Sequence, residues 1–87
     1  MAEFDSTTVT ISRHAKRRMQ LYGVTADEVK ACIAEPQAAT VQADGTLVAV
    51  RQFPNRFNEL PLKVVYLRDG AVAHVLTAFP WKGKSGG

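Results

Sequence analysis

The amino-acid sequence predicts a single α+β domain in which two N-terminal helices pack on a four-stranded antiparallel sheet. The first observation behind this prediction is a pair of helix-capping patterns within the first 36 residues. The second is the change to β-prone runs after Pro36, and the third is the pair of Asp-Gly steps that separates those runs. Helical signals followed by hairpin signals are typical of folds that segregate helices and an antiparallel sheet.

The size and composition of the chain agree with one globular domain. Its 87 residues can build one core but not two, and 46% hydrophobic with 22% charged residues is an ordinary globular composition. Eleven basic residues against eight acidic ones give a net charge of +3, which permits a polyanionic partner without requiring one. Composition therefore leaves both an enzyme and a binding module open.

The sequence also bears on the compartment. Cys32 is the only cysteine, so no internal disulfide can form, and its apolar surroundings predict a buried small side chain. The first residues, Met-Ala-Glu-Phe-Asp, are acidic and are followed by no apolar run, and no stretch of the chain is apolar for long enough to cross a bilayer. We therefore expect a cytoplasmic protein.

The first helix is expected over residues 13–22. Ser12 is a suitable N-cap, the following residues are good helix formers, and Gly23 stands where a helix usually ends in a left-handed residue. Residues 1–11 are expected to form a short N-terminal lead-in, in which the β-prone stretch 7–11 could form a strand. The main domain is expected over residues 12–80.

The second helix has the strongest local signal in the chain. Thr25-Ala-Asp-Glu28 matches a capping box, and Val24 and Val29 occupy the positions of a hydrophobic staple. Pro36 cannot continue a helix, so we expect this helix to end at the preceding glutamate.

Four strands are expected after Pro36, paired as two hairpins. Asp44-Gly45 and Asp69-Gly70 predict the tight turns, and the Pro- and Asn-rich segment 54–61 predicts a longer connection between the hairpins. Residues 81–87 are expected to form a basic, flexible tail. The expected strands span residues 38–43, 47–53, 63–67 and 71–79.

The first candidate site is a ridge on the first helix. His14, Arg18 and Tyr22 are spaced four residues apart, which brings their side chains into one row along the edge of the apolar stripe. An arginine can hold two phosphate oxygens in its planar fork, and a histidine can give or take a proton near neutral pH. The ridge therefore indicates a phosphate site with acid–base capacity. In the alternative interpretation Arg18 forms a structural ion pair with a carboxylate of the second helix. The carboxylates considered are Asp27, Glu28 and Glu35.

Further candidates come from the sheet. Arg51 alternates with apolar residues on its strand, so its charge needs an anion, either a substrate phosphate or a carboxylate such as Glu28 or Glu59. Tyr66 and Thr77 are the hydroxyls expected to share a sheet face near it, although each is equally typical of a core strand position. The candidate catalytic set is His14, Arg18, Arg51, Tyr66 and Thr77.

Cofactors are not expected. Two histidines and one cysteine do not provide a zinc-ligand cluster, and no glycine-rich phosphate loop is present. His74, flanked by apolar residues, is interpreted as an ordinary strand residue. Basic and aromatic residues outside the ridge could contact RNA, but a solvated charged surface explains most of them equally well. The RNA-binding candidates are Arg17, Lys63, Trp81, Lys82 and Lys84.

Several short motifs together resemble a known bacterial family. They are the run from Ser12 to Met19 (Ser-Arg-His-Ala-Lys-Arg-Arg-Met), Gly23-Val24-Thr25, Pro36, Val64-Val-Tyr66, and the run from Val75 to Pro80. The chain resembles the family called domain of unknown function 4258, which is similar in architecture to RelE and ParE toxins and to small metal-independent ribonucleases. In that pattern His14, Arg18 and Thr77 match family positions, whereas Tyr22 replaces a usual arginine and Phe79 a frequent aromatic hydroxyl.

The residues and the resemblance lead to two functional hypotheses. The first is a toxin-like ribonuclease that uses no metal, with His14 for acid–base chemistry and arginines on the phosphate. The second is a non-catalytic protein-binding toxin or regulator of the ParE type, which predicts an exposed apolar patch around Phe53, Phe57 and Leu60, with the arginines paired to carboxylates. A toxin also implies a cognate antitoxin or immunity protein as a partner.

Overall fold

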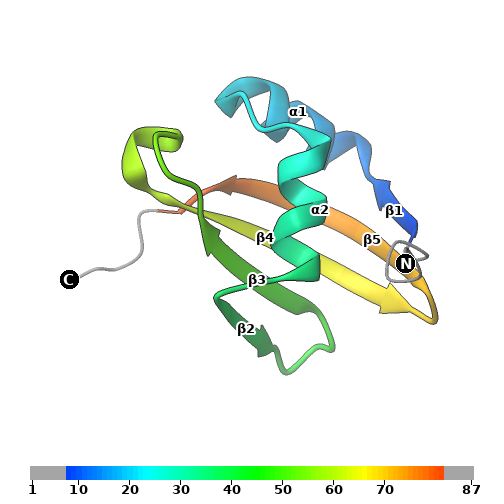
Figure 1. Ribbon diagram of the computed structural model, residues 1–87. Helices are drawn as coiled ribbons and strands as arrows, with labels where there is room; N and C mark the ends of the chain where they lie inside the picture. The colour runs from blue at the N-terminus through cyan, green and yellow to red at the C-terminus, as the bar shows by residue number, and fades with distance from the viewer. Residues whose placement is uncertain (1–7, 82–87) are drawn as a thin grey trace, which may run out of the picture.

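The structure is a computed structural model and describes residues 8–81 of the chain. Within these residues, one strand is followed by two helices and then by four strands, and one 3-10 turn lies in the connection between the second and third of those four strands (Figure 1). The elements in chain order are β1 (Thr8–Ile11), α1 (Arg13–Tyr22), α2 (Ala26–Ala34), β2 (Ala38–Val41), β3 (Leu47–Gln52), η2 (Phe57–Glu59), β4 (Pro61–Asp69) and β5 (Val72–Pro80).

The sheet corrects the sequence prediction. It has five strands in the order β1-β5-β4-β3-β2, and the β1–β5 pair is parallel, so the predicted four-stranded antiparallel sheet is wrong. The additional strand is the β-prone stretch of the lead-in, in which Thr8 to Ile11 pair with Val72 to Val75. Thr10 also contacts His74 through a hydrogen bond of 2.8 Å between the hydroxyl and Nδ1. The remaining pairs are antiparallel, as predicted.

Local capping defines both helices and confirms their predicted starts. The Ser12 hydroxyl accepts a hydrogen bond from the Ala15 N–H at 3.1 Å, and Gly23 ends α1 with a left-handed φ of 73°. In α2 the capping box is complete, because the Glu28 N–H donates to the Thr25 hydroxyl and the Thr25 N–H donates to the Glu28 carboxylate.

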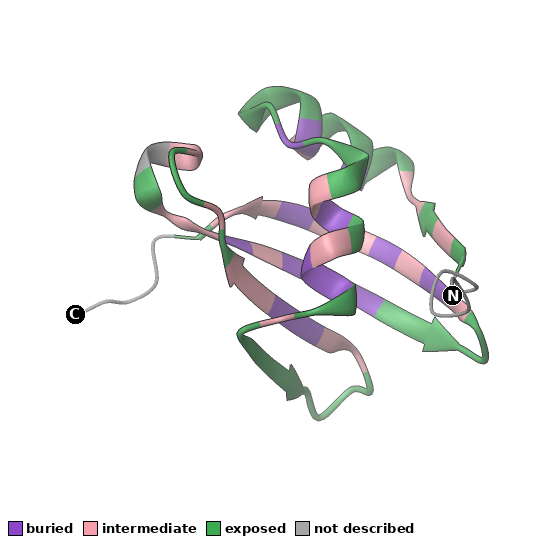
Figure 2. Cartoon of the chain, viewed as in Figure 1, coloured by how far each residue is buried: buried purple, intermediate pink, exposed green. Residues whose placement is uncertain are grey.

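The core lies between the helices and one face of the sheet. Both helices cover the same face, and the buried positions of α2 and of the central strands meet there (Figures 1 and 2). Along β4 the buried Leu62, Val64 and Tyr66 alternate with less buried residues, as expected when only one face of a strand is covered. Cys32 is fully buried, as predicted, and its thiol lies 3.4 Å from the Ala49 carbonyl oxygen.

One edge of the sheet is shared between a strand and a helix. β1 pairs with only Val72 to Val75, so the second half of β5 has no strand neighbour on that side among the described residues. α1 occupies that position and is joined to β5 at its start, where the Ser12 N–H donates to the Val75 carbonyl and the Ser12 hydroxyl donates to the Leu76 carbonyl. Within residues 8–81 neither helix is long and apolar enough to cross a membrane.

Candidate functional site

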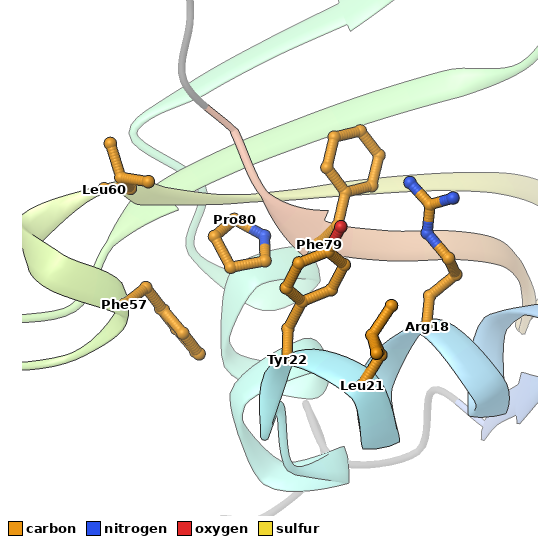
Figure 3. A pocket seen from close by; sticks show the side chains of 7 residues that line it. All are labelled: Arg18, Leu21, Tyr22, Phe57, Leu60, Phe79 and Pro80. Carbon is orange, nitrogen blue, oxygen red and sulfur yellow. The ribbon is translucent and has the colours of Figure 1, made fainter.

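A cleft of about 620 Å³ opens beside the C-terminal ends of α1 and β5. Side chains of α1 and β5 form one side, and side chains from the β3–β4 connection form the other, with Pro80 between them (Figure 3). Its lining is aromatic and apolar except for one arginine and one phenol hydroxyl. The lining residues are Arg18, Leu21, Tyr22, Phe57, Leu60, Phe79 and Pro80.

The Arg18 guanidinium lies near two aromatic rings of this cleft. Its Cζ atom is 5.1 Å from the centre of the Phe79 ring and 5.9 Å from the centre of the Tyr22 ring. Both distances are within the range of cation–π attraction. Its Nε–H is buried and has no hydrogen-bond partner, the single such side-chain nitrogen or oxygen within residues 8–81. The unpaired buried Nε–H is costly to the fold, whereas the two Nη nitrogens are not buried and can donate to an anion.

The carboxylates considered as partners for Arg18 lie elsewhere. Glu28 binds Arg56, and the Glu35 carboxylate lies 3.5 Å from Arg51. Asp27 is exposed on the first turn of α2. In the described part of the chain, no ion pair involves a residue of α1. The ion-pair interpretation of Arg18 therefore has no support in the geometry.

A clamp by Arg56 fixes the far wall of the cleft. Its Nε and Nη2 donate to the two Glu28 carboxylate oxygens at 2.6 and 2.8 Å, and Nη2 also donates to the Gly23 carbonyl at 2.7 Å. The hydrogen bonds from Arg56 hold the pKa of Glu28 below its ordinary value. The clamp holds a connection in which Asn55, Phe57 and Glu59 all have positive φ angles, a conformation that non-glycine residues rarely adopt.

His14 lies on α1 one turn before Arg18. The side chains are four residues apart, about 6 Å along the helix axis, and they share a flank of the helix. α1 is joined to Leu76 at Ser12 and to Phe79 at Arg18, so this flank runs beside the segment of β5 that contains Thr77. The imidazole of His14 is exposed. Of the predicted catalytic residues, the fold therefore places His14 and Arg18 on one flank of α1, and Thr77 lies on the neighbouring strand β5 without a described contact to either.

Arg51 and Tyr66 do not line the cleft. Arg51 extends from β3 toward the C-terminal end of α2, where its Nη1 donates to the Ala31 and Glu35 carbonyls at 3.4 Å. Its anionic partner is thus Glu35, rather than the two glutamates considered from the sequence. Tyr66 is 7% exposed and belongs to the helix-facing core. Thr77 pairs with Val65, a position that alternates with the core-facing ones, so the two hydroxyls lie on opposite faces of the sheet.

The described RNA-binding candidates fall into two groups. Arg17 lies on the exposed face of α1 together with Arg13 and Lys16, and α1 has no acidic residue. On the sheet, the Lys63 ammonium lies 4.7 Å from the centre of the exposed Trp81 ring, and Lys63 is opposite Phe79 in the β4–β5 register. This second group adjoins the cleft. Lys82 and Lys84 lie outside the described residues.

Sequence reasoning did not identify the cleft itself. Tyr22 and Phe79 depart from the family pattern by lacking its polar groups, yet they are the two rings beside the Arg18 guanidinium. The sequence predicts Phe57 and Leu60 in a protein-binding patch with Phe53, whereas the structure shows them in the wall of the cleft opposite Arg18. The sequence feature that could have indicated the cleft is the pair of aromatic residues at position 22, on the same ridge as Arg18, and at position 79.

Comparison of the chain with protein-family models, with curated proteins and with solved structures finds no match. The resemblance to domain of unknown function 4258 therefore stays a prediction. Within residues 8–81 no three histidine, cysteine, aspartate or glutamate side chains are grouped so that they could hold a metal ion.

Proposed function

We propose that the chain is a small, toxin-like endoribonuclease that cleaves RNA with its own side chains. The observation that carries this proposal is the Arg18 guanidinium, which has no carboxylate partner among the described residues and lies at a cleft beside a helix without acidic residues. A phosphodiester accepts hydrogen bonds from the two Nη nitrogens of Arg18, which are not buried. The basic face of α1 attracts the rest of the RNA backbone.

The reaction is a transfer within the RNA strand. His14 takes the proton from a ribose 2′-hydroxyl, and the resulting oxygen attacks the adjacent phosphorus. Arg18 stabilises the charge that develops on the phosphoryl oxygens, because its donors are already oriented in a partly water-excluded site. The bond to the 5′-oxygen breaks, and that oxygen takes a proton from water. The products are a 2′,3′-cyclic phosphate and a free 5′-hydroxyl.

The test compares the two histidines of the chain. Purified wild-type protein is incubated with single-stranded RNA in the presence of a metal chelator, and the RNA ends are identified by mass spectrometry. We expect His14→Ala to lose cleavage at least tenfold, since acid–base catalysis usually contributes a factor of about 10²–10⁴. His74→Ala is the matched control and retains cleavage, because His74 lies on β5 and contacts Thr10 of β1. Full cleavage by His14→Ala excludes the assigned role.

A second candidate function is supported by the apolar wall of the cleft. Leu21 is 72% exposed and Tyr22 is 44% exposed, and both line the same cleft, so they form part of one exposed apolar patch of the kind that can bind a protein. A toxin of the ParE type, acting by binding a protein target, fits this feature. Inducible expression in bacteria separates the two functions. Growth arrest with fragmented RNA supports the ribonuclease, whereas arrest with intact RNA supports a protein target.

The proposed function implies two properties of the protein in the cell. An RNA substrate places it in the cytoplasm. A cognate antitoxin, if it neutralises by blocking the cleft, carries carboxylates for Arg18 and the basic face of α1 together with apolar groups for the exposed Leu21.

A further inference from the structure

The side chains that line the cleft include a single cation and few other hydrogen-bonding groups. Of its seven lining side chains, only Arg18 and Tyr22 have a polar atom. A site for phosphate alone is normally polar and uses several donors. The lining instead suits a ligand that is anionic at one end and flat and apolar at the other.

We propose that the cleft holds one unstacked nucleobase of single-stranded RNA, with a neighbouring phosphate on Arg18. This inference rests on the proposed function for the identity of the polymer, but it does not require cleavage. The base lies between the α1 and β5 side of the cleft and the side formed by Phe57 and Leu60 (Figure 3). Its flat faces contact apolar and aromatic side chains, as in other proteins that bind single-stranded nucleic acids.

The dimensions of the cleft agree with such a ligand. Its volume of about 620 Å³ is within the range of about 300–1,000 Å³ that is usual for pockets of small organic ligands. A base in a duplex has both faces covered by its neighbours, so it enters only after it leaves the stack. The cleft therefore selects single-stranded RNA or an unpaired nucleotide.

The same lining predicts weak sequence preference. Discrimination among bases needs hydrogen bonds to their edges, and the apolar side chains of the cleft cannot make them. Stacking is available to every base because each has a π-face. The Lys63 and Trp81 pair, next to Phe79 across the sheet, offers a second cation and ring to the adjacent nucleotide.

The experiment separates the contribution of the base from that of the phosphates. Two short single strands of 2′-O-methyl RNA are compared, one complete and one with abasic residues at the central positions. The 2′-O-methyl group removes the nucleophile, so binding is measured without turnover, by fluorescence anisotropy at fixed salt. We expect the abasic strand to bind the wild-type protein roughly 5- to 150-fold more weakly, the range that stacking of one base usually gives.

Two variants assign this difference to the cleft. Tyr22→Leu removes an exposed ring without introducing a polar group, and we expect it to lose most of the preference for the complete strand. Phe79→Leu tests the second ring near Arg18 in the same way. Arg17→Ala is the matched control on the exposed face of α1. It lowers the affinity for both strands by the same factor, because it removes only a phosphate contact.

The outcomes distinguish this inference from the proposed function. Equal affinity of the wild-type protein for the two strands overturns the base site and leaves RNA binding intact. Equally tight binding of a matched duplex overturns the selection of single strands. Absence of binding to any RNA overturns both proposals and favours the protein-binding function.

Discussion

Arg18 is expected to limit stability slightly while it supports binding, and Arg18→Met tests this directly. Methionine keeps an unbranched stem near Tyr22 and Phe79 but removes the charge and the unpartnered Nε–H. The loss of two cation–π contacts costs about 1–2 kcal/mol in total. Removal of a buried, unsatisfied donor gains about 1–3 kcal/mol. We therefore expect the free energy of unfolding to change by less than about 1 kcal/mol, or to rise.

Arg51→Met is the matched control for this substitution. Arg51 also lies near an aromatic ring, at 5.3 Å from the centre of Phe53, but its guanidinium has protein acceptors at 3.4–3.5 Å. These contacts are long and Glu35 is largely exposed, so their loss costs about 1–2 kcal/mol rather than more. Nothing offsets this loss, since no atom of Arg51 is a buried unpartnered donor.

The assay is urea unfolding of the wild type and the two variants, followed by far-ultraviolet circular dichroism. With equal slopes, the shift of the midpoint reports the change in stability. Arg18→Met should unfold close to or above the wild-type midpoint, and Arg51→Met clearly below it. Destabilisation by Arg18→Met as large as that by Arg51→Met refutes the reasoning, because the guanidinium of Arg18 would then have a structural partner. RNA affinity, measured on the same samples, should fall for Arg18→Met.

Three further predictions concern the stability and reactivity of the fold. In the wild type, the contribution of the Glu28–Arg56 ion pair is complete above the ordinary pKa of glutamate and is lost as the pH falls through the lowered pKa of folded Glu28. Glu28→Gln should therefore be less stable than the wild type at neutral pH, and urea midpoints measured at decreasing pH should converge; a constant difference contradicts this. Burial raises the pKa of Cys32 to about 11, so iodoacetamide should modify it far more slowly in the folded protein than in urea, as followed by mass spectrometry. Leu62→Ala empties a fully buried position under α2 and should lower the free energy of unfolding by about 2–5 kcal/mol in a urea titration, whereas a loss below about 1 kcal/mol would place Leu62 outside the core.

Features encoded by neighbouring residues could be predicted from the sequence. Ser12, the Thr25 capping box and Gly23 each act within one helical turn, and the structure confirms the two helix starts and the end of α1 that they indicate. The Asp69-Gly70 turn likewise joins β4 and β5 as expected. β1 was not predicted as a sheet strand, because its partner is far along the chain and no turn connects them.

The candidate site also combines features that local sequence patterns predict with features that depend on contacts between distant residues. The ridge of His14 and Arg18 follows from helical spacing, and the structure brings Arg18 of this ridge to Phe79 of β5. The alternation of residue types along the strands predicts the strand positions of Arg51 and Tyr66. It does not indicate that α2 covers the face of the sheet on which they lie. The wall opposite Arg18 depends on the Arg56–Glu28 contact across 28 residues, which no local pattern indicates.

The parallel pairing of β1 with β5 has a consequence for how the chain folds. Thr10 and His74 are 64 residues apart, so this contact closes a loop that contains both helices and three strands. Such closure is slow relative to the formation of helices and hairpins. During synthesis, β1 emerges before any of its partner has been made. We expect α1 to remain without its β5 neighbour until the last strand is complete, so the cleft forms late and all at once.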